Sequence, residues 1–304
     1  MKEFNLEEVV DCGFTITSKR KRVWQIELEM FQELDRVCKK YHLKFFADSG
    51  TLLGTIRHQG FIPWDDDMDF VMLREDYNKL LKVAEKEFKE PFFFQTAYSD
   101  KGYYRGHAQI RNSNTTGILP YEGNNVSFHQ GIFIDIFPLD FVSKNQLVET
   151  IRHKRLVRRM KLFDILLNRT PSPNKIKENV KKMIRFVYQK RDVQKMYATY
   201  EKIASHVPFK SEEVCKVSYY TNGKKYKLFP KKYFEEVEYK DFENTQLPVS
   251  KEYNKILTMY YGKDYIKPQN KSSSHGTVIY EVDEKYTEVL NKMKEGKTYE
   301  NFDL

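Results

Sequence analysis

Four aspartates directly before an apolar strand restrict this sequence more than any other feature. Residues 65–69 read DDDMD and lead into an apolar stretch that ends at Leu73. Alternate residues of a strand project from one face about 6.5 Å apart, so Asp67 and Asp69 should point the same way. Carboxylates this close repel one another unless a cation compensates, and hard oxygen ligands favour Mg²⁺ or Mn²⁺. We therefore predict a metal site here; a solvated acidic turn is the alternative.

A third carboxylate is expected from a neighbouring strand. Asp135 lies inside the apolar segment 132–137, which reads IFIDIF. Burying a carboxylate among apolar side chains costs several kcal/mol unless the group is paired or bound to a metal. We therefore predict that Asp135 completes the metal site with Asp67 and Asp69. A salt bridge between Asp135 and Arg111 is the alternative.

A short turn upstream of the aspartates has the features of a phosphate site. It consists of Ser49, Gly50 and Thr51 and precedes a predicted short helix over residues 51–58. Glycine lets the backbone approach a ligand closely, and the free N–H groups of a helix start attract anions. We predict that this turn binds phosphate.

Three basic side chains could offset the charge that develops on a transferred phosphoryl group. They are Arg57, His58 and Arg111. Arg57 and His58 could equally hold the aspartates in position without contacting the substrate. We assign a catalytic role to Arg57 and a substrate-binding role to His58, Arg111 and the neighbouring Trp64.

The order of the predicted elements indicates a mixed α/β sheet flanked by helices. Apolar residues recur at helical spacing over 20–42 and 74–88, and short apolar runs suggest strands at 43–47, 68–73, 92–95, 107–111 and 131–137. After residue 143 the sequence becomes helical in pattern and rich in Lys and Arg. We therefore divide the chain into a catalytic core, residues 1–142, and a mainly helical C-terminal region, residues 143–304, packed on that core.

Charge and cysteine content narrow the range of partners and compartments. The 304 residues carry a formal net charge of +9, which favours nucleotides, nucleic acid, phosphorylated glycans or an acidic membrane. The three cysteines form no CxxC pair, so we expect neither a disulfide framework nor a cysteine-based zinc site. The sequence has no recognisable signal peptide and no long apolar run, so we expect a cytoplasmic protein.

A dense basic run covers residues 152–161. It could belong to a nucleic-acid-binding module, but no stacking motif or known nucleic-acid fold accompanies it, so we do not expect nucleic acid as a partner. A second interpretation is peripheral contact with the anionic inner face of a membrane, where lipid-linked acceptors reside.

The central motif resembles the signature of the LicD family, which includes the fukutin-related proteins. Residues 46–69 read FADSGTLLGTIRHQGFIPWDDDMD, and the segments 74–77 (REDY) and 133–140 (FIDIFPLD) agree with the family as well. The matches span roughly residues 22–140. The resemblance implies a nucleotidyltransferase-like fold and metal-dependent transfer of a phospho-substituent from a CDP-activated donor. In bacteria the family theme is phosphocholine added to a cell-surface glycan.

Family roles can be carried over only where residues match. Gly50 and Thr51 then fall at the phosphate turn, Asp67 and Asp69 at the metal pair and Asp135 at the third carboxylate. The family often ends its core with Tyr-Gly-Asp, two prolines and a pair of histidines. The counterpart here is residues 261–265 (YGKDY) with Pro268 and His275, and the second proline and second histidine are absent.

These observations lead to one main hypothesis and two alternatives. We expect a CDP-alcohol donor, with choline favoured, and an acceptor hydroxyl on a surface glycan or its lipid-linked precursor. CMP leaves, and either Asp67 or Asp135 takes the hydroxyl proton. Ribitol or glycerol phosphate could be transferred instead, and a DxD-type glycosyltransferase using a nucleotide sugar would share the metal chemistry. An aromatic cage would favour choline, and its candidates are Trp64, Tyr103, Tyr104 and Tyr121.

Overall fold

The computed structural model describes residues 4–217, 227–267 and 278–299. Its helices are α1 (Ser18–Lys40), α2 (Ser49–Arg57), α3 (Arg74–Glu87), α4 (Gln146–Leu167), α5 (Lys175–Tyr188), α6 (Val193–Ser205), α7 (Tyr253–Tyr261) and α8 (Tyr286–Lys294). The strands are β1 (Val9–Asp11), β2 (Phe14–Ile16), β3 (Phe46–Ala47), β4 (Asp69–Leu73), β5 (Phe92–Gln95), β6 (Ala108–Asn112), β7 (Thr116–Ile118), β8 (Phe133–Ser143), β9 (Lys210–Cys215), β10 (Phe229–Pro230), β11 (Val237–Phe242), β12 (Thr245–Ser250) and β13 (Ile279–Glu281).

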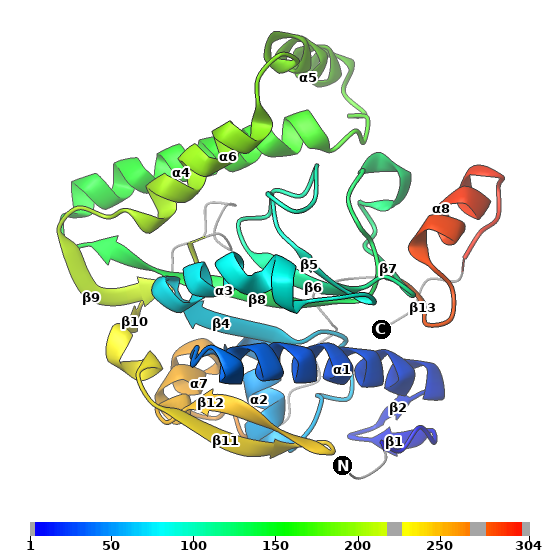
Figure 1. Ribbon diagram of the computed structural model, residues 1–304, viewed down its shortest axis with the longest axis vertical. Helices are drawn as coiled ribbons and strands as arrows, with labels where there is room; N and C mark the ends of the chain where they lie inside the picture. The colour runs from blue at the N-terminus through cyan, green and yellow to red at the C-terminus, as the bar shows by residue number, and fades with distance from the viewer. Residues whose placement is uncertain (1–3, 218–226, 268–277, 300–304) are drawn as a thin grey trace.

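A mixed seven-stranded sheet forms the centre of the molecule, so the predicted fold class is confirmed (Figure 1). Its long strand β8 runs parallel to β4 on one side. On the other side the first half of β8 pairs antiparallel with β6 and its second half pairs with β9. Strand β3 extends the sheet beyond β4, β5 lies beyond β6, and β10 lies beyond β9.

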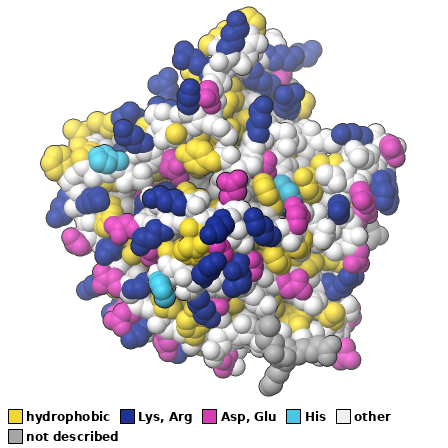
Figure 2. Space-filling model, viewed as in Figure 1, with side chains coloured by type: hydrophobic (Ala, Val, Ile, Leu, Met, Phe, Trp, Pro, Cys, Tyr) yellow, Lys and Arg dark blue, Asp and Glu magenta, His cyan; other side chains and the backbone are white. Residues whose placement is uncertain are grey.

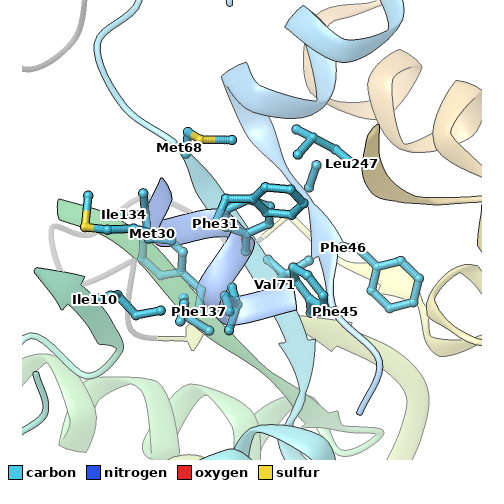
Figure 3. Close-up of a cluster of buried hydrophobic side chains, with 14 of the residues drawn as sticks. Met30, Phe31, Phe45, Phe46, Met68, Val71, Ile110, Ile134, Phe137 and Leu247 are labelled. Atoms are coloured by element: carbon cyan, nitrogen blue, oxygen red, sulfur yellow. The ribbon is translucent and has the colours of Figure 1, made fainter. Parts of the chain in front are cut away.

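Helix α1 forms because its apolar residues recur on one side. The buried residues of that stripe include Val23, Met30, Leu34 and Val37, and the Thr17 side chain accepts a hydrogen bond from Arg20 N at the helix start. Phe31 of α1 stacks on Phe70 of β4, with ring centroids 5.6 Å apart. In Figure 3, Met30 and Phe31 of α1 lie among core side chains from β3, β4, β6, β8 and β12.

An ion pair joins two of the segments that carried the family resemblance. Arg74, the first residue of α3, donates from Nε and Nη2 to the two carboxylate oxygens of Asp140 in β8, each at 2.7 Å. Glu201 of α6 lies 3.4 Å from the same guanidinium. Such a bidentate pair has fixed geometry, so it sets the angle at which α3 leaves the sheet.

Residues after 142 form part of the central sheet itself, which corrects our expectation that they form a mainly helical region packed on the core. The predicted boundary falls inside β8, and β9 and β10 from the C-terminal half extend the central sheet. The hairpin β11–β12 covers β3 and α2, and β13 pairs with β7. Residues 215–245 alternate aromatic and charged residues in the sequence, and this pattern predicts no strands there.

Helices α4 and α6 lie on the side of the sheet opposite to α1 (Figure 1). A second buried cluster attaches them to the sheet, and it contains Tyr104, Val142, Leu156, Phe163, Tyr197, Tyr200 and Cys215. Within the described segments, no helix is both long enough and apolar enough to cross a membrane.

Candidate functional site

Two of the predicted aspartates lie side by side on the central sheet. Strands β4 and β8 run parallel with Asp69 opposite Asp135, so both side chains project from the same face. Asp69 N donates to Thr51 Oγ1 at 2.8 Å, and Asp48 N donates to Asp69 O at 3.0 Å. The predicted phosphate turn and the predicted acidic strand are therefore joined by direct hydrogen bonds.

Asp135 is buried and held by residues of the neighbouring strand β6 and the loop before it. Gln109 Nε2 donates to Asp135 Oδ1 at 2.6 Å, and His107 Nε2 lies 3.2 Å from the same oxygen. Burial alone would raise the pKa of Asp135, but His107 and the hydrogen bonds lower it below its ordinary value. The carboxylate is therefore ionised at neutral pH.

Our assignment of Arg111 as a substrate ligand is wrong in this structure. Its side chain is completely buried and donates to Gln95 Oε1, Gln109 Oε1 and the Gly131 carbonyl at 2.7–2.8 Å. Burial, with Arg105 nearby, lowers its pKa to about 10. Arg111 donates a hydrogen bond to Gln109, and Gln109 donates one to Asp135. Arg111 therefore positions Asp135 indirectly, through Gln109. Gln109 thus bridges Arg111 and Asp135, in place of the direct salt bridge that was the alternative.

Three consecutive acids of the loop before β4 converge. One carboxylate oxygen from each of Asp65, Asp66 and Asp67 lies within 4.8 Å of the others. Asp66 is buried and accepts a hydrogen bond from Tyr280 OH at 3.1 Å, which fixes the loop to the C-terminal half. Hard oxygen donors at this spacing fit a divalent cation. Among the described residues, the predicted trio Asp67, Asp69 and Asp135 does not form so tight a group.

Gly50 allows the acidic loop to approach the phosphate turn. A Cβ atom at this position would collide with the carboxylate of Asp65. Any larger residue would displace the Asp65 carboxylate from the start of α2. The structure therefore gives a steric reason for this glycine.

A buried lysine lies beside the turn, and sequence reasoning did not identify it. Lys216 Nζ is 2.5 Å from Asp48 Oδ2 and 2.9 Å from Ser49 Oγ, and Tyr260 OH donates to the same Asp48 oxygen. Burial alone would lower the pKa of Lys216, but Asp48, Tyr260 and Asp69 raise it well above its ordinary value. The lysine is thus a fixed positive charge next to the phosphate turn.

His107 is a second residue that the sequence analysis missed. The sequence predicts only a strand that begins at His107, yet in the structure His107 contacts Asp135, and its Nδ1 has no hydrogen-bond partner within the described part of the chain. The alternation of His107, Gln109 and Arg111 along one strand was the available signal. Lys216 gave none, because 168 residues separate it from its partner Asp48.

Arg57, His58 and Trp64 lie together at the opposite end of α2 from Ser49. Arg57 Nε donates to His58 Nε2 at 2.9 Å, and its Nη1 donates to the Tyr265 carbonyl at 3.3 Å. The Trp64 ring meets His58 edge-on. Their predicted contacts with substrate stay predictions. His275 and Pro268 lie outside the described residues.

A pocket of about 500 Å³ opens between the sheet and α4. Asp135, His107 and Arg105 line one wall, and α4 contributes Met160, Phe163 and Asp164 to the other. Further aromatic lining comes from Tyr104, Tyr121, Phe128 and Phe137. The volume is typical of small-molecule sites. Of the four aromatic residues that we proposed for a cage, Tyr104 and Tyr121 line this pocket; Tyr103 and Trp64 are not among its lining residues.

Comparison with known proteins agrees with this arrangement. A model of the LicD/FKTN/FKRP nucleotidyltransferase domain matches residues 42–162, which include the phosphate turn, most of α4 and the six aspartates Asp48, Asp65, Asp66, Asp67, Asp69 and Asp135. The chain is 30% identical over 254 residues to the lipopolysaccharide cholinephosphotransferase LicD of Haemophilus influenzae, covering 82% of this chain and 92% of that protein. It is also 27% identical over 127 residues to an uncharacterized protein of Rickettsia prowazekii, covering 41% of this chain and 45% of that protein.

Proposed function

Because the chain belongs to the LicD/FKTN/FKRP nucleotidyltransferase family, we propose that it transfers phosphocholine from a CDP-activated donor to a hydroxyl group of lipopolysaccharide or a related surface glycan. One observation carries this proposal beyond family membership. A pocket lined by aromatic side chains has Asp135 in its wall, directly beside the acidic strand. If the reacting phosphorus lies at the carboxylates, the pocket next to it has room for the quaternary ammonium group of choline.

The donor pyrophosphate would lie at the start of α2. Backbone N–H groups at Ser49, Gly50 and Thr51 and the positive end of the helix dipole favour anions there. Lys216 supports this placement, because its buried ammonium group lies within 2.9 Å of Ser49 Oγ. The site therefore combines a point charge with backbone donors, as is common in phosphate binding.

The carboxylates fit a hard divalent cation. We propose that Asp67, Asp69 and Asp135 hold Mg²⁺ or Mn²⁺, with Asp65 added from the convergent loop. When bound, the ion would neutralise charge on the donor phosphates. The protein's own part is to fix these carboxylates. Thr51 Oγ1 accepts a hydrogen bond from the backbone N–H of Asp69. Gln109 donates a hydrogen bond to Asp135, and Arg111 donates one to Gln109.

In the proposed reaction the acceptor hydroxyl oxygen forms a bond to the phosphorus that bears choline. The bond from that phosphorus to the oxygen bridging the two phosphates breaks, and CMP leaves with the electron pair. Asp135 takes the hydroxyl proton, because it is the carboxylate that lines the pocket and is ionised at neutral pH. The product is a phosphodiester between choline and the glycan.

The pocket's lining favours choline over an uncharged polyol. Aromatic faces attract a quaternary ammonium group, and this preference rests on the aromatic lining alone, because Arg105 and Lys161 balance the charges of Asp135 and Asp164 in the same pocket. Ribitol and glycerol would gain nothing from the aromatic faces and would lose hydrogen bonds to water. We therefore rank CDP-choline above CDP-ribitol and CDP-glycerol.

A panel of CDP-alcohols tests the proposal. The protein is incubated with Mg²⁺, a glycan acceptor and each donor in turn, and CMP release is measured. Asp69→Asn should reduce turnover by about a thousandfold, because loss of one metal ligand removes several kcal/mol of charge stabilisation. Asp241→Asn, which changes an exposed carboxylate on β11, is the matched control and should retain activity. Wild-type turnover in Asp69→Asn would refute the scheme.

A further inference from the structure

Helix α5 presents most of its apolar side chains to solvent, whereas Ile184 and Tyr188 are half-buried. None of its residues is buried, and Ile176, Met183, Phe186 and Val187 are 76%, 61%, 71% and 62% exposed. At about 100° per residue, positions 176, 180, 183 and 187 form one stripe along the helix. Figure 1 shows α5 projecting beyond α4 and α6, away from the sheet.

The polar side of α5 is the side attached to the molecule. Arg185 Nε donates to the Ile165 carbonyl at 2.8 Å and its Nη2 to the Asn168 carbonyl at 3.0 Å, both near the end of α4. Glu178 pairs with Arg185 and accepts from Ser172 N at 2.9 Å. This is the reverse of an ordinary surface helix, which turns its apolar stripe toward the core.

Basic residues flank the apolar stripe. Residues 175–191 contain seven Lys or Arg and a single Glu. Lys175, Lys177 and Lys182 are exposed on α5, and Lys190 and Arg191 follow it. In Figure 2 apolar and basic atoms together cover the projecting part that Figure 1 identifies as α5.

We propose that α5 docks on the surface of an anionic lipid bilayer, with its apolar stripe inserted between headgroups and its lysines on lipid phosphates. An amphipathic helix with a basic polar side is the usual element for such interfacial binding. A second copy of the chain fits less well, because two such helices face to face would bring like charges together. Of the basic run 152–161, Arg152 is buried and bound to Glu149 and to backbone carbonyls, whereas Lys154, Arg155, Arg158 and Lys161 are exposed, so the earlier interpretation of that run stays a prediction.

Docking through α5 would bring the pocket close to the bilayer. Leu167 and Asn168 line the pocket at the end of α4, and Arg185 of α5 binds the Asn168 carbonyl. If the proposed function holds, a lipid-linked acceptor would then reach the pocket from the membrane surface. This consequence rests on the proposed function, whereas membrane docking itself does not.

Vesicle flotation tests the docking directly and needs no activity. The full chain is mixed with vesicles of phosphatidylcholine containing phosphatidylglycerol, and with vesicles of phosphatidylcholine alone. The triple variant Ile176→Ser/Met183→Ser/Phe186→Ser should bind the anionic vesicles about a hundredfold more weakly, because three inserted side chains are lost. The control Leu147→Ser/Ile151→Ser removes two exposed apolar side chains at the other end of α4 and should float like wild type.

The outcomes separate membrane docking from its rivals. Flotation that needs the anionic lipid, weakens with salt and is lost only in the α5 variant supports the proposal. Equal flotation of the α5 variant and wild type would overturn it, as would failure of wild type to bind. A concentration-dependent dimer that the variant abolishes, without vesicle binding, would assign the stripe to a second copy instead. If flotation behaves as expected but no CDP-alcohol is turned over, only the proposed function fails.

Discussion

Lys216 and Asp48 illustrate how single residues in the site depend on partners far away in sequence. Both side chains are 2% exposed, and their charged atoms lie 2.5 Å apart. A buried pair of this kind contributes little net stability as a pair, but loss of one member leaves an uncompensated charge. The pair also fixes the Lys216 ammonium group beside the predicted phosphate turn, with Asp48 balancing its charge.

Lys216→Met should therefore lower the free energy of unfolding by about 3 kcal/mol, because the Asp48 carboxylate would be buried without its partner. Adding Asp48→Asn removes that charge, so the double variant should recover part of the loss. Urea denaturation measures both. Lys39→Met, at an exposed pair with Asp35, should change stability by less than about 0.5 kcal/mol. Simple additivity of the two buried substitutions would contradict the pairing.

The sequence identified the acidic residues better than the basic ones. Asp69 and Asp135 could be predicted, because a carboxylate in an apolar strand has few structural explanations. Arg111 was misassigned because burial cannot be read from one residue, and the amides of Gln95 and Gln109 that satisfy it come from two strands. Lys216 and His107 could not be assigned without knowing which segments become neighbours.

At the level of elements, Glu87 joins the end of α3 to the end of α1. It accepts hydrogen bonds from Lys40 Nζ at 2.8 Å and Tyr41 OH at 2.7 Å, and Arg36 lies 3.4 Å away. These donors, Lys40 first, lower the pKa of Glu87 from its ordinary 4.5 to about 2. The stabilisation is therefore complete above about pH 5 and is lost as the pH falls toward 2.

Glu87→Gln should be less stable than wild type at pH 7, and the difference should shrink between pH 4.5 and about 2, where wild type also becomes protonated. Thermal unfolding at a series of pH values measures this. A gap between the two proteins that stays constant down to pH 2 would show that the carboxylate charge is irrelevant.

The pocket between α4 and the sheet offers a test of the transferred alcohol. Tyr121→Leu keeps an apolar wall but removes an aromatic face, so the KM for CDP-choline should rise about tenfold, with little change for CDP-ribitol. Steady-state kinetics with both donors measures the ratio. Tyr239→Leu, which changes a tyrosine on β11 outside the pocket lining, is the control. An equal rise in KM for both donors would argue against binding of the choline group in this pocket.

Helices α1 and α3 followed from periodicity, since one buried side gives a clear spacing. Strands β3, β4, β5, β6 and the first part of β8 followed from short apolar runs, whereas β1, β2 and β7 were not predicted. Strands β9, β11 and β12 were not predicted either, because none of them is a continuous apolar run: β9 reads KSEEVC, β11 reads VEYKDF and β12 reads TQLPVS. They gain their stability from long-range pairing, with β8 for β9 and with each other for β11 and β12. Such pairing has no local signal.

For the whole molecule, the two halves of the chain build one site. The first half supplies the aspartates and the phosphate turn, and the second supplies Lys216, Tyr260, Tyr280 and the α4 wall of the pocket. Lys216, Tyr260 and Tyr280 therefore lie outside the matched family domain, residues 42–162, although they are part of the site.

In the reaction that we propose, a phosphocholine group moves intact to the acceptor with CMP as the leaving group. Phosphorus NMR of the reaction with CDP-choline, Mg²⁺ and a lipopolysaccharide acceptor measures this directly. We predict that CMP and a new phosphodiester signal on the glycan appear in equal amounts, and that neither appears with Asp69→Asn. Absence of a phosphodiester signal with CDP-choline, combined with release of a nucleoside diphosphate from a nucleotide sugar, would contradict the account.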